Sequence, residues 1–532
     1  MLQTFTRNRK SSGLFSATAY RLVYNQESLK ELLQAPFEID AIKKQALIKK
    51  NTYPKTHRLT IHEVISEQYY GYSLSTKTQQ NIAALKNENT FTITTGHQLN
   101  LFTGPLYVIY KILHVINLTE TLNLENDGNT YVPVFWMATE DHDFEEINHA
   151  TVFGKKISWE EKQNGPVGHY DLNQWEVLQS TLHDLFAKHP DSEIHSIIDR
   201  YDGANFAEAT KQLVHYLFNE YGLIIIEPND KKLKKLFTSY LKEEITTKFV
   251  EKSVSETFEV MEQLQIKPQA NPRPINLFYI EKGVRDRIIP NANGSLEIQS
   301  LGNLSLDQLN LLIEQSPENF SPNVLMRPLY QETILPNLVY VGGAGEINYW
   351  TQLKSSFEHV EQVFPLIQVR LSALLIEPTI QKKWQKLGFS WDELFKPTSD
   401  LQKEYIKKNN HELLDFTSLE DLTEQLIAQL NQQILSVDTQ LTKFSEAESS
   451  KLTKQIDSIK EKLVKHQKTH FEQAMKQIED IHLKLFGTGS FQERTDNFFS
   501  FCPTGEIHSK IEALKNVLNP LEKDLQIVLL DT

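Results

Sequence analysis

Glu140, Asp141, His142 and Asp143 form a run of four ionisable side chains one residue after the apolar segment YVPVFWMA. Four such groups cannot all be buried without partners. In open α/β sheets, ligands bind at the edge where parallel strands end. A carboxylate or imidazole at that edge could deprotonate an incoming amine as a general base. We therefore expect catalytic residues here, with a solvated loop and helix cap as the simpler alternative.

The same acidic segment could contact a metal ion. His142 and His149 are seven residues apart with carboxylates around them, and both ligand types suit several divalent ions. No histidine spacing places the ligands on one helix face, however. We therefore predict no dedicated metal site and favour Mg²⁺ carried in with a nucleotide over zinc.

A second segment, TTGHQLNLFTGP, carries His97 after a short apolar strand. We interpret Gly96 as part of a tight turn that lets backbone approach a ligand. A helix beginning near Pro105 would direct free N–H groups and a positive dipole end at an anion. His97 could stabilise a phosphate charge or transfer a proton. The alternative is a structural turn with a surface histidine. The predicted nucleotide-binding residues are Thr95, Gly96, Gln98, Gly104 and Pro105.

A third segment, SPNVLMRPLYQETILPNLVYVGGAGEINYW, contains Arg327 and a Gly-Gly-x-Gly turn before a helix. Such a turn could wrap a phosphate or carboxylate, or could simply join a strand to a helix. Arg370 is a further cation at a strand end. Arg285 and Arg287 could also serve an anionic substrate, although exposed arginines are commonly just solvated.

Composition limits the functional classes. The chain has 532 residues and a formal net charge of −14, which argues against a broad nucleic-acid surface. Cys502 is the only cysteine, so no intrachain disulfide is expected. We find no secretory signal and no apolar run long enough for a membrane span. The expectation is a cytoplasmic protein.

The segments that position these residues have the sequence pattern of an α/β fold. Strand-like and helix-like segments alternate from Phe91 to about Pro378, which favours a largely parallel sheet. The predicted catalytic core is residues 1–380, with insertions at about 153–221 and 230–275. The predicted strands are Phe91–Thr95, Tyr131–Ala138, Leu223–Pro228, Asn276–Ile280, Val339–Val341 and Leu366–Arg370.

Residues 381–490 have the pattern of an α-helical coiled-coil arm. One register runs through Ile427, Leu430, Ile434, Val437, Leu441 and Phe444, and a second begins at Leu452. The polar segment Ser445–Lys451 could be the turn of an antiparallel hairpin or a stutter in one helix. We expect the arm to pair, most simply in a homodimer, with intramolecular packing as the alternative. Residues 491–532 are expected to return onto the core as helices.

Together these segments, with the tail FQERTDNFF, resemble the cysteine ligase family of bacillithiol biosynthesis over nearly the whole chain. The resemblance implies a Rossmann-like core similar to class I nucleotidyltransferases and aminoacyl-tRNA synthetases, with a dimerising coiled coil. It implies the addition of L-cysteine to glucosaminyl-malate. His97 would take the place of the synthetases' histidine motif, although the chain has neither an HxGH pair nor a KMSKS-like lysine loop.

That reaction needs an activated cysteine carboxylate, most simply from ATP, together with a base for the amine. Asp141, His142 or Asp143 would be the base, with Glu140 as its orienter. Malate is a dianion that a bidentate arginine would clamp. The expected substrate-binding residues are Asn148, Arg327, Gln331, Gly343, Gly345, Glu346, Tyr349 and Arg370.

Three alternatives remain at this point. The nucleotide could bind near the arm, in a rival pocket around Trp384, Arg494 and Asn497. The chain could be another nucleotidyltransferase-like amide ligase that acts on a different amine. It could also be a non-catalytic scaffold built around the coiled coil.

Overall fold

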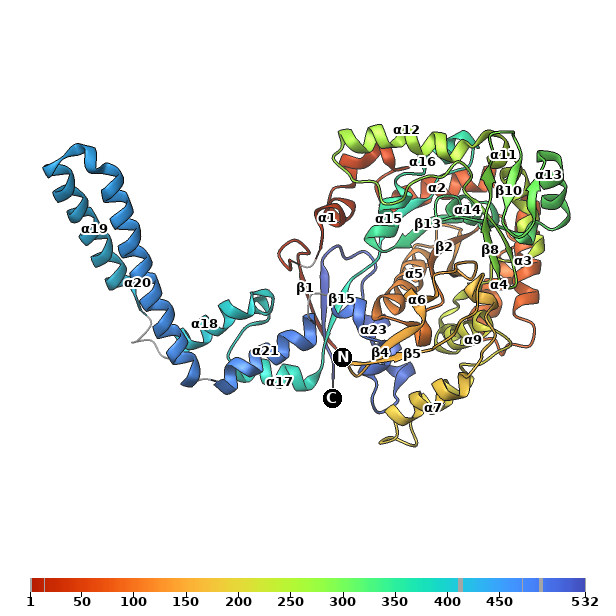
Figure 1. Ribbon diagram of the computed structural model, residues 1–532. Coiled ribbons are helices and arrows are strands. Elements are labelled where there is room, and N and C mark those ends of the chain that lie inside the picture. Colours follow the sequence, from red (N-terminus) through yellow and green to blue (C-terminus); the bar gives the residue numbers. More distant parts are fainter. Residues whose placement is uncertain (1, 14, 410–414, 471, 488–490, 532) are drawn as a thin grey trace. The chain divides into compact units, whose positions relative to one another are not determined.

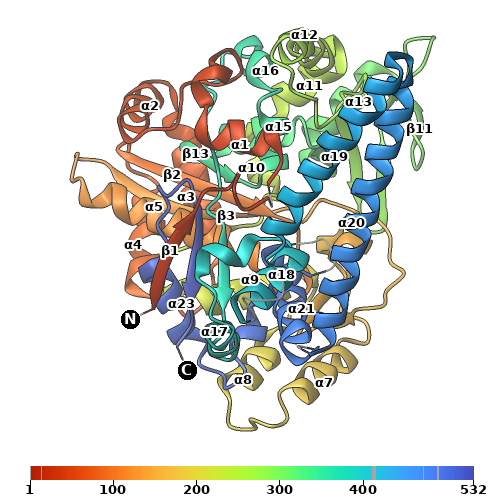
Figure 2. The same ribbon diagram turned by 90° about the vertical axis from the view of Figure 1, so that its left-hand side faces the viewer.

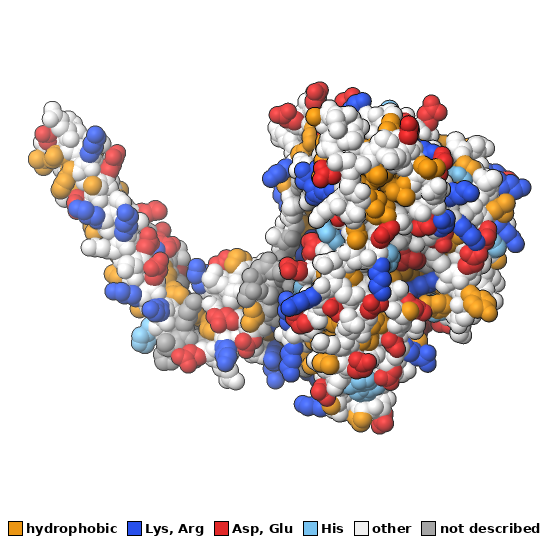
Figure 3. Space-filling model, turned by 45° about the vertical axis from the view of Figure 1, so that its right-hand side comes forward, with side chains coloured by type: hydrophobic (Ala, Val, Ile, Leu, Met, Phe, Trp, Pro, Cys, Tyr) orange, Lys and Arg blue, Asp and Glu red, His pale blue; other side chains and the backbone are white. Residues whose placement is uncertain are grey.

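The computed structural model describes residues 2–13, 15–409, 415–470, 472–487 and 491–531 (Figure 1). The chain forms two compact units. The first comprises residues 1–375 and 492–528, and the second comprises residues 376–491 and 529–532. Among the described helices, none is both long and apolar enough to cross a membrane. On the face shown in Figure 3, Lys and Arg side chains are interspersed with Asp and Glu.

A five-stranded sheet with the order β14-β13-β2-β3-β6 forms the centre of the first unit. All four neighbouring pairs are parallel, as the alternation of elements predicted. Its strands are buried along almost their whole length because both faces are covered. The strands are β2 (Thr90–His97), β3 (Thr130–Met137), β6 (Ile224–Ile226), β13 (Asn337–Gly342) and β14 (Leu366–Val369).

Helices cover both faces of this sheet (Figure 1). One face packs against α5 (Leu106–Leu124), whose residues are nearly all buried. The other face joins a large apolar cluster that includes Val134, Ile226 and Tyr340 from alternate sheet positions. The helices that contribute to this cluster are α1 (Ala17–Tyr24), α3 (Lys55–Gln68), α4 (Thr76–Ala84), α10 (Lys231–Leu236), α11 (Thr238–Thr247), α12 (Phe249–Gln263), α13 (Leu306–Gln315), α14 (Arg327–Ile334), α15 (Ala344–Trp350) and α16 (Lys354–His359).

The strand expected at 276–280 does not join the parallel sheet, so that part of the prediction is wrong. It forms β7 (Leu277–Glu281) of a separate antiparallel sheet with β8 (Val284–Arg287) and β12 (Phe320–Pro322). Gly283 has a positive φ of 79° between β7 and β8. A two-residue turn of this kind returns the chain at once, so the two strands must be antiparallel.

Further elements complete the first unit. The insertion after β3 contains a hairpin of β4 (His149–Val152) and β5 (Lys155–Ser158), followed by α7 (Trp175–Leu185), α8 (Glu193–Arg200) and α9 (Phe206–Phe218). The C-terminal segment contains the expected helix, α23 (Ile507–Val517). It also contains the strand β16 (Leu525–Leu529), which was not expected and which lies between β1 (Gln3–Arg7) and β15 (Ala373–Ile376).

The second unit is helical. It contains α17 (Pro378–Lys386), α18 (Thr398–Asn409), α19 (Thr417–Val437), α20 (Thr442–His470) and α21 (Glu472–Phe486). Helices α19 and α20 lie side by side as an antiparallel hairpin (Figures 1 and 2). The Glu420–Lys460 ion pair and the hydrogen bond from Ser449 to Asn431 set their register. The hairpin interpretation of the coiled-coil pattern is therefore confirmed.

The turn of this hairpin lies at Asp438–Leu441, so the placement at Ser445–Lys451 is wrong. Asp438 has an extended backbone, and its carboxylate accepts a hydrogen bond from the Gln440 amide at 2.8 Å. This local bond competes with the continuation of α19 and starts the next turn. Ser445–Lys451 lies inside α20, where Ser445 is buried and donates to Asn431 of α19 and most of the other side chains are exposed.

Candidate functional site

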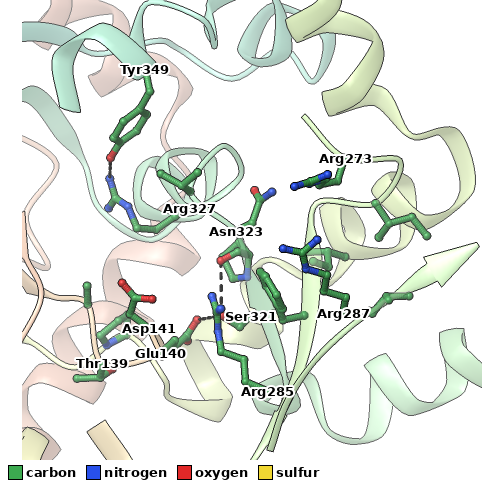
Figure 4. Close-up of a pocket in the computed structure, with 18 of the residues that line it drawn as sticks. Thr139, Glu140, Asp141, Arg273, Arg285, Arg287, Ser321, Asn323, Arg327 and Tyr349 are labelled. Atoms are coloured by element: carbon green, nitrogen blue, oxygen red, sulfur yellow. Dashed lines mark hydrogen bonds between the residues drawn. The ribbon is translucent and has the colours of Figure 1, made fainter. Parts of the chain in front are cut away.

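A cavity of about 680 Å³ lies at the carboxyl edge of the central sheet and is closed on another side by β7, β8 and β12 (Figure 4). Its volume is in the usual range for small-molecule sites. The cavity brings together eight residues that sequence reasoning placed in a site, from segments far apart in the chain. These are Gly96, His97, Gln98, Glu140, Asp141, Arg327, Glu346 and Tyr349.

Glu140 and Asp141 follow β3 and line the cavity. The Glu140 carboxylate lies 2.5 Å from the buried Lys234 ammonium and accepts a hydrogen bond of 2.6 Å from Ser321. Asp141 accepts a 2.7 Å hydrogen bond from the Gln98 amide. Burial raises the pKa of Asp141, but hydrogen bonds from His142 and Gln98 outweigh it and hold the pKa well below its usual range. Asp141 is therefore a stable negative charge and a weak base.

The next residues of the acidic segment lie outside the set that lines the cavity. His142 is exposed and accepts a 2.8 Å hydrogen bond from Arg285. Asp143 is exposed at the start of α6 (Phe144–Ile147). Asn148 ends that short helix, and its side chain contacts the neighbouring His149 at 3.1 Å. Of the four consecutive ionisable residues, the first two therefore face the cavity.

His97 ends β2 and has partners on both ring nitrogens. Lys111 of α5 donates to Nδ1 at 3.3 Å, and the Tyr107 hydroxyl lies 3.0 Å from Nε2. Nδ1 as acceptor means that Nε2 carries the hydrogen of a neutral imidazole. Burial and the nearby charges of Lys111 and Arg370 lower the pKa of His97 well below its usual value. His97 is thus held as a neutral, oriented ring.

Lys111 was not anticipated from sequence, although it is the lone cation in the apolar run LYVIYKILHV. Its side chain is fully buried, donates to the Gly96 carbonyl at 2.9 Å and pairs with Glu346 of α15. Tyr340 donates to the other Glu346 oxygen at 3.0 Å. Because Glu346 lines the cavity, the buried lysine fixes a carboxylate at the cavity wall.

Arg327 lies at the start of α14 and enters the cavity among aromatic rings. Its guanidinium is 5.6 Å from the Trp136 ring centre and 5.4 Å from that of Tyr340. It donates to Gln331 at 2.9 Å and to the Tyr349 hydroxyl at 3.4 Å. These contacts hold a cation in place while it still faces the cavity (Figure 4).

Three further arginines line the same cavity: Arg273, Arg285 and Arg287. Arg285 and Arg287 alternate on β8 and therefore lie on one face of that strand. Figure 4 shows Arg273 and Arg287 across the cavity from Asp141. Sequence reasoning named the two β8 residues as possible contacts of an anionic substrate, with solvated side chains as the alternative, and missed Arg273. The β7–β8 turn brings Arg285 and Arg287 to the cavity, and Arg273 reaches it from the segment before β7.

A buried carboxylate holds this arginine-bearing wall. Glu244 of α11 accepts hydrogen bonds from the backbone and side-chain amides of Asn276, both at 2.9 Å. The Asn276 side chain in turn accepts from the Arg273 backbone and from Asn323, which lines the cavity. Burial raises the pKa of Glu244 to about 7. One side chain thus connects two loops of the cavity wall.

The segment around Gly96 differs from the expected turn. Gly96 lies inside β2, and an added Cβ would be 3.2 Å from the Trp136 Cβ and carbonyl oxygen. Its small size therefore serves strand packing. Thr95 is buried and donates to the Val341 carbonyl at 2.7 Å. Gly104 and Pro105 precede α5, and Leu106, its first residue, donates its amide to Asp496 at 2.8 Å.

The remaining predicted substrate residues are engaged elsewhere. Arg370 forms a buried two-pronged ion pair with Glu493 at 2.6 and 3.0 Å, so the expected clamp is instead a structural pair. Gln331 is buried against Arg327 and Glu332. Gly343 and Gly345 belong to the start of α15, where the cavity is lined by Glu346 and Tyr349.

The residues of the rival nucleotide pocket fall in different places. Trp384 is buried in the second unit, where its indole donates to Ser390 at 3.0 Å. Asn497 is in the first unit and donates to the carbonyls of Phe102 and Gly104. Arg494 lines a second cavity of about 370 Å³. That cavity also contains Gln98, which borders the main cavity too.

Comparison with known proteins gives a consistent family assignment. Residues 6–371 match the family described as "Bacillithiol biosynthesis BshC, N-terminal Rossmann-like domain", and residues 373–530 match its C-terminal coiled-coil domain. A relative from Flavobacterium johnsoniae named "Putative cysteine ligase BshC" is 37% identical over 98% of both chains. Proteins of the same name from Flavobacterium psychrophilum and Cytophaga hutchinsonii are 36% identical over 98% of both chains and 34% identical over 97% of both chains. With its Rossmann-like sheet and its helical hairpin, the chain belongs to the BshC family of bacillithiol biosynthesis.

Proposed function

We propose that this chain is a ligase that joins L-cysteine to glucosaminyl-malate to form bacillithiol. The names of its relatives support this proposal. The observation that carries it is the charge arrangement of the main cavity, in which four arginines face two strand-end carboxylates. Such a cavity suits a substrate with a dianionic end and a basic amine.

The arginine side would bind the malate carboxylates. Arg327 is preorganised by aromatic rings, and Arg285 lies 3.7 Å from the Phe278 ring centre. A guanidinium matches a carboxylate with two parallel hydrogen bonds, which adds geometric specificity to the charge. Arg273 and Arg287 are more exposed and complete this side.

The acidic side would hold the sugar amine. Asp141 stays ionised because its pKa is held low, and Glu140 and Glu346 lie on the same cavity wall. Carboxylates here attract an ammonium group and place its nitrogen near the carboxyl edge of the sheet. The amine must then lose a proton before it attacks the cysteine carboxyl carbon.

We further propose that ATP activates the cysteine carboxylate, with Mg²⁺ bound through the nucleotide phosphates. A free carboxylate is a poor electrophile, and transfer of a phosphoryl or adenylyl group supplies a leaving group. Gly96 and Gln98 at the end of β2 would border the phosphates. The arginines of the cavity supply the cations that such phosphates need.

The Arg494 cavity is the other place for the nucleotide, since both cavities share Gln98. Substitutions of Arg327 and Arg494 by alanine separate the two places. If the nucleotide binds at the end of β2 in the main cavity, Arg327→Ala raises the KM for ATP as well as the KM for glucosaminyl-malate, and Arg494→Ala leaves the KM for ATP near the wild-type value. The reverse result moves the nucleotide to the Arg494 cavity.

We also propose that the hairpin of α19 and α20 mediates a homodimer. Ile427, Leu430 and Ile434 of the predicted register are partly buried within the hairpin, whereas Val437 and Phe444 of the same register are exposed. A further set of apolar residues stays exposed along it, as Figure 3 shows. This set is Leu422, Leu426, Val437, Phe444, Ile459 and Leu463. A second hairpin would cover these side chains.

The test is mass spectrometry of purified protein incubated with glucosaminyl-malate, cysteine and Mg-ATP. We expect bacillithiol to form only when ATP is present. Arg287→Ala should raise the KM for glucosaminyl-malate by about 10- to 100-fold, because a charged hydrogen bond contributes about 1.5–3 kcal/mol. Arg200→Ala is the matched control, since this arginine at the end of α8 stacks on Tyr216 of α9, outside the residues that line the cavity.

Three results would contradict the proposal. Folded protein that makes no product favours the scaffold alternative. Equal turnover of amines that lack malate favours a different amide ligase. If Arg287→Ala leaves the KM for glucosaminyl-malate unchanged, the arginine-bearing wall does not recognise the substrate.

A further inference from the structure

Glu227 is a carboxyl group at the sheet edge that the proposed reaction has not used. It follows β6, which runs parallel to β3, so it reaches the carboxyl edge beside Thr139. The Thr139 hydroxyl donates to Glu227 Oε1 at 2.5 Å, and the Asn229 amide donates to the same oxygen at 2.9 Å. Thr139 lines the main cavity, whereas Glu227 lies behind it.

The other candidate bases at this edge are poorly suited to accept a proton. The pKa of Asp141 is held well below its usual range. Both ring nitrogens of His97 have partners. The Glu140 carboxylate pairs with Lys234 and accepts from Ser321. A base works best when its pKa lies near the working pH, which directs attention to Glu227.

The Glu227 side chain is half-buried, and its desolvation by the surrounding protein raises its pKa to about 7. Hydrogen bonds from Thr139 and Asn229 act in the opposite direction without cancelling the effect. Several charged or titratable groups from neighbouring elements face it, and His169 reaches it through Asn229. These groups are Glu140, Lys211, Lys234 and Tyr330.

We propose that Thr139 and Glu227 form a proton relay that removes the proton from the attacking amine; this rests on the proposed ligation. The amine nitrogen forms a bond to the cysteine carbonyl carbon, and the bond to the leaving phosphate oxygen breaks with its electron pair on that oxygen. The nitrogen proton passes to the Thr139 hydroxyl oxygen while the hydroxyl proton passes to Glu227. Thr139 contacts the substrate, and Glu227 acts through it as a positioning residue.

The relay has a defined pH dependence. Ionised Glu227 accepts the hydroxyl proton, so Thr139 presents a lone pair to the cavity. Protonated Glu227 donates to Thr139 instead, and Thr139 then presents a hydrogen that the amine cannot use. Turnover should therefore rise as the pH increases through the pKa of Glu227. We would follow kcat, because kcat/KM also reflects ionisation of the free amine.

The first experiment measures kcat from pH 5.5 to 9 for wild type and Glu227→Gln. Glu227→Gln should lower kcat at pH 8 by about 100-fold or more, a usual effect of removing a general base. It should also remove the rise of kcat near pH 7, which we call the pH limb. Glu244→Gln is the matched control, because burial also raises the pKa of that carboxyl to about 7 but its partner is Asn276. The control should retain the limb.

A pair of threonine variants keeps the test valid if Glu227→Gln fails to fold. Thr139→Val removes the hydroxyl at constant shape and should lower kcat at pH 8 in the same way. Thr139→Ser keeps the hydroxyl and should restore the wild-type profile. A merely structural role for Thr139 would not produce this rescue together with a loss of the pH limb.

Infrared difference spectroscopy supplies a readout without turnover. Glu227 and Glu244 should both contribute protonated carboxyl bands that titrate near pH 7. The band that is lost in Glu227→Gln should be displaced in Thr139→Val and unchanged in Glu244→Gln. If the rise of kcat near pH 7 persists in Glu227→Gln or in Thr139→Val, the relay is wrong and the proposed ligation still stands. The same conclusion follows if Thr139→Val leaves the Glu227 carboxyl band unchanged. Wild-type protein that makes no product at any pH overturns the proposed function and the relay together.

Discussion

At the residue scale, the pair of Lys111 and Glu346 connects the core to the cavity wall. The lysine side chain is fully buried and that of Glu346 is 27% exposed. Lys111 also contacts His97 and the Gly96 carbonyl. One cation therefore orients a histidine, the end of a strand and a carboxylate. Such a charge is costly to bury unless every partner is present.

Lys111→Met should lower the free energy of unfolding by about 2–4 kcal/mol, since it leaves the partly exposed Glu346 carboxylate without its charge partner. The double variant Lys111→Met/Glu346→Gln should recover part of this loss. Urea unfolding of Lys111→Met, Glu346→Gln and the double variant measures the coupling free energy of the pair. Lys43→Met, which breaks an exposed pair with Glu125, is the control and should have a much smaller effect. Equal losses of unfolding free energy in Lys111→Met and Lys43→Met would show that the buried pair is not coupled as described.

At the element scale, close packing of β2 on β3 explains Gly96. Gly96→Ala places a Cβ 3.2 Å from the Trp136 Cβ and backbone oxygen, so the strands must shift. We expect a loss of about 1–3 kcal/mol in the free energy of unfolding. Gly345→Ala is the matched control, because nothing lies within 4 Å of its added Cβ on α15. It should keep both stability and turnover. Lost turnover in Gly345→Ala would restore the ligand-wrapping interpretation of the Gly-Gly-x-Gly turn.

The α11 carboxylate Glu244 gives the fold a pH dependence. Its pKa rises from 4.5 in the unfolded chain to about 7 when folded, because burial disfavours the charge. The folded state therefore binds this proton more tightly. The free energy of unfolding falls by ~3 kcal/mol in total as the pH rises from about 4.5 to about 7, at ~1.4 kcal/mol per pKa unit. Above pH 7 this contribution is constant. Urea unfolding between pH 5 and 8 should show a shallower fall in Glu244→Gln. The exposed substitution Glu88→Gln should leave the wild-type slope, and equal slopes in all three proteins would refute this assignment.

At the scale of the whole molecule, the hairpin of α19 and α20 presents apolar side chains that one chain leaves exposed. Leu426 is 53% exposed and Ile459 is 49% exposed. The double variant Leu426→Glu/Ile459→Glu should convert a wild-type dimer to a monomer in sedimentation experiments, because buried like charges oppose association. Leu47→Glu, on α2 (Ile39–Thr52), is the control at an exposed apolar site outside the hairpin. Wild-type protein that sediments as a monomer at all concentrations would contradict the dimer.

Much of the fold could be predicted from local pattern. The five central strands are apolar runs between helical segments, and this pattern is specific to a parallel sheet. The coiled-coil periodicity left a hairpin and a single helix with a stutter as alternatives. The turn was expected at 445–451 and lies earlier, because the capping role of Asp438 is decided by local backbone geometry. The strand at 276–280 was found but assigned to the wrong sheet, because pairing depended on the turn at Gly283.

The candidate site was predictable where strand ends carry the chemistry. Glu140, Asp141 and His97 follow apolar strands, and parallel strands end at one edge. Arg327 also reached the cavity as expected. Arg370 did not, because Glu493, more than a hundred residues later, takes its guanidinium.

The sequence by itself determined the alternation of strands and helices, the periodic hairpin and the polar groups at strand ends, since each of these depends on neighbours close along the chain. Only the tertiary structure decided which charges meet. It pairs Lys111 with Glu346, folds three arginines over the sheet edge and places Glu227 behind Thr139. The physical reason is that ion pairing and burial depend on distances between segments far apart in sequence, and no local pattern encodes those distances.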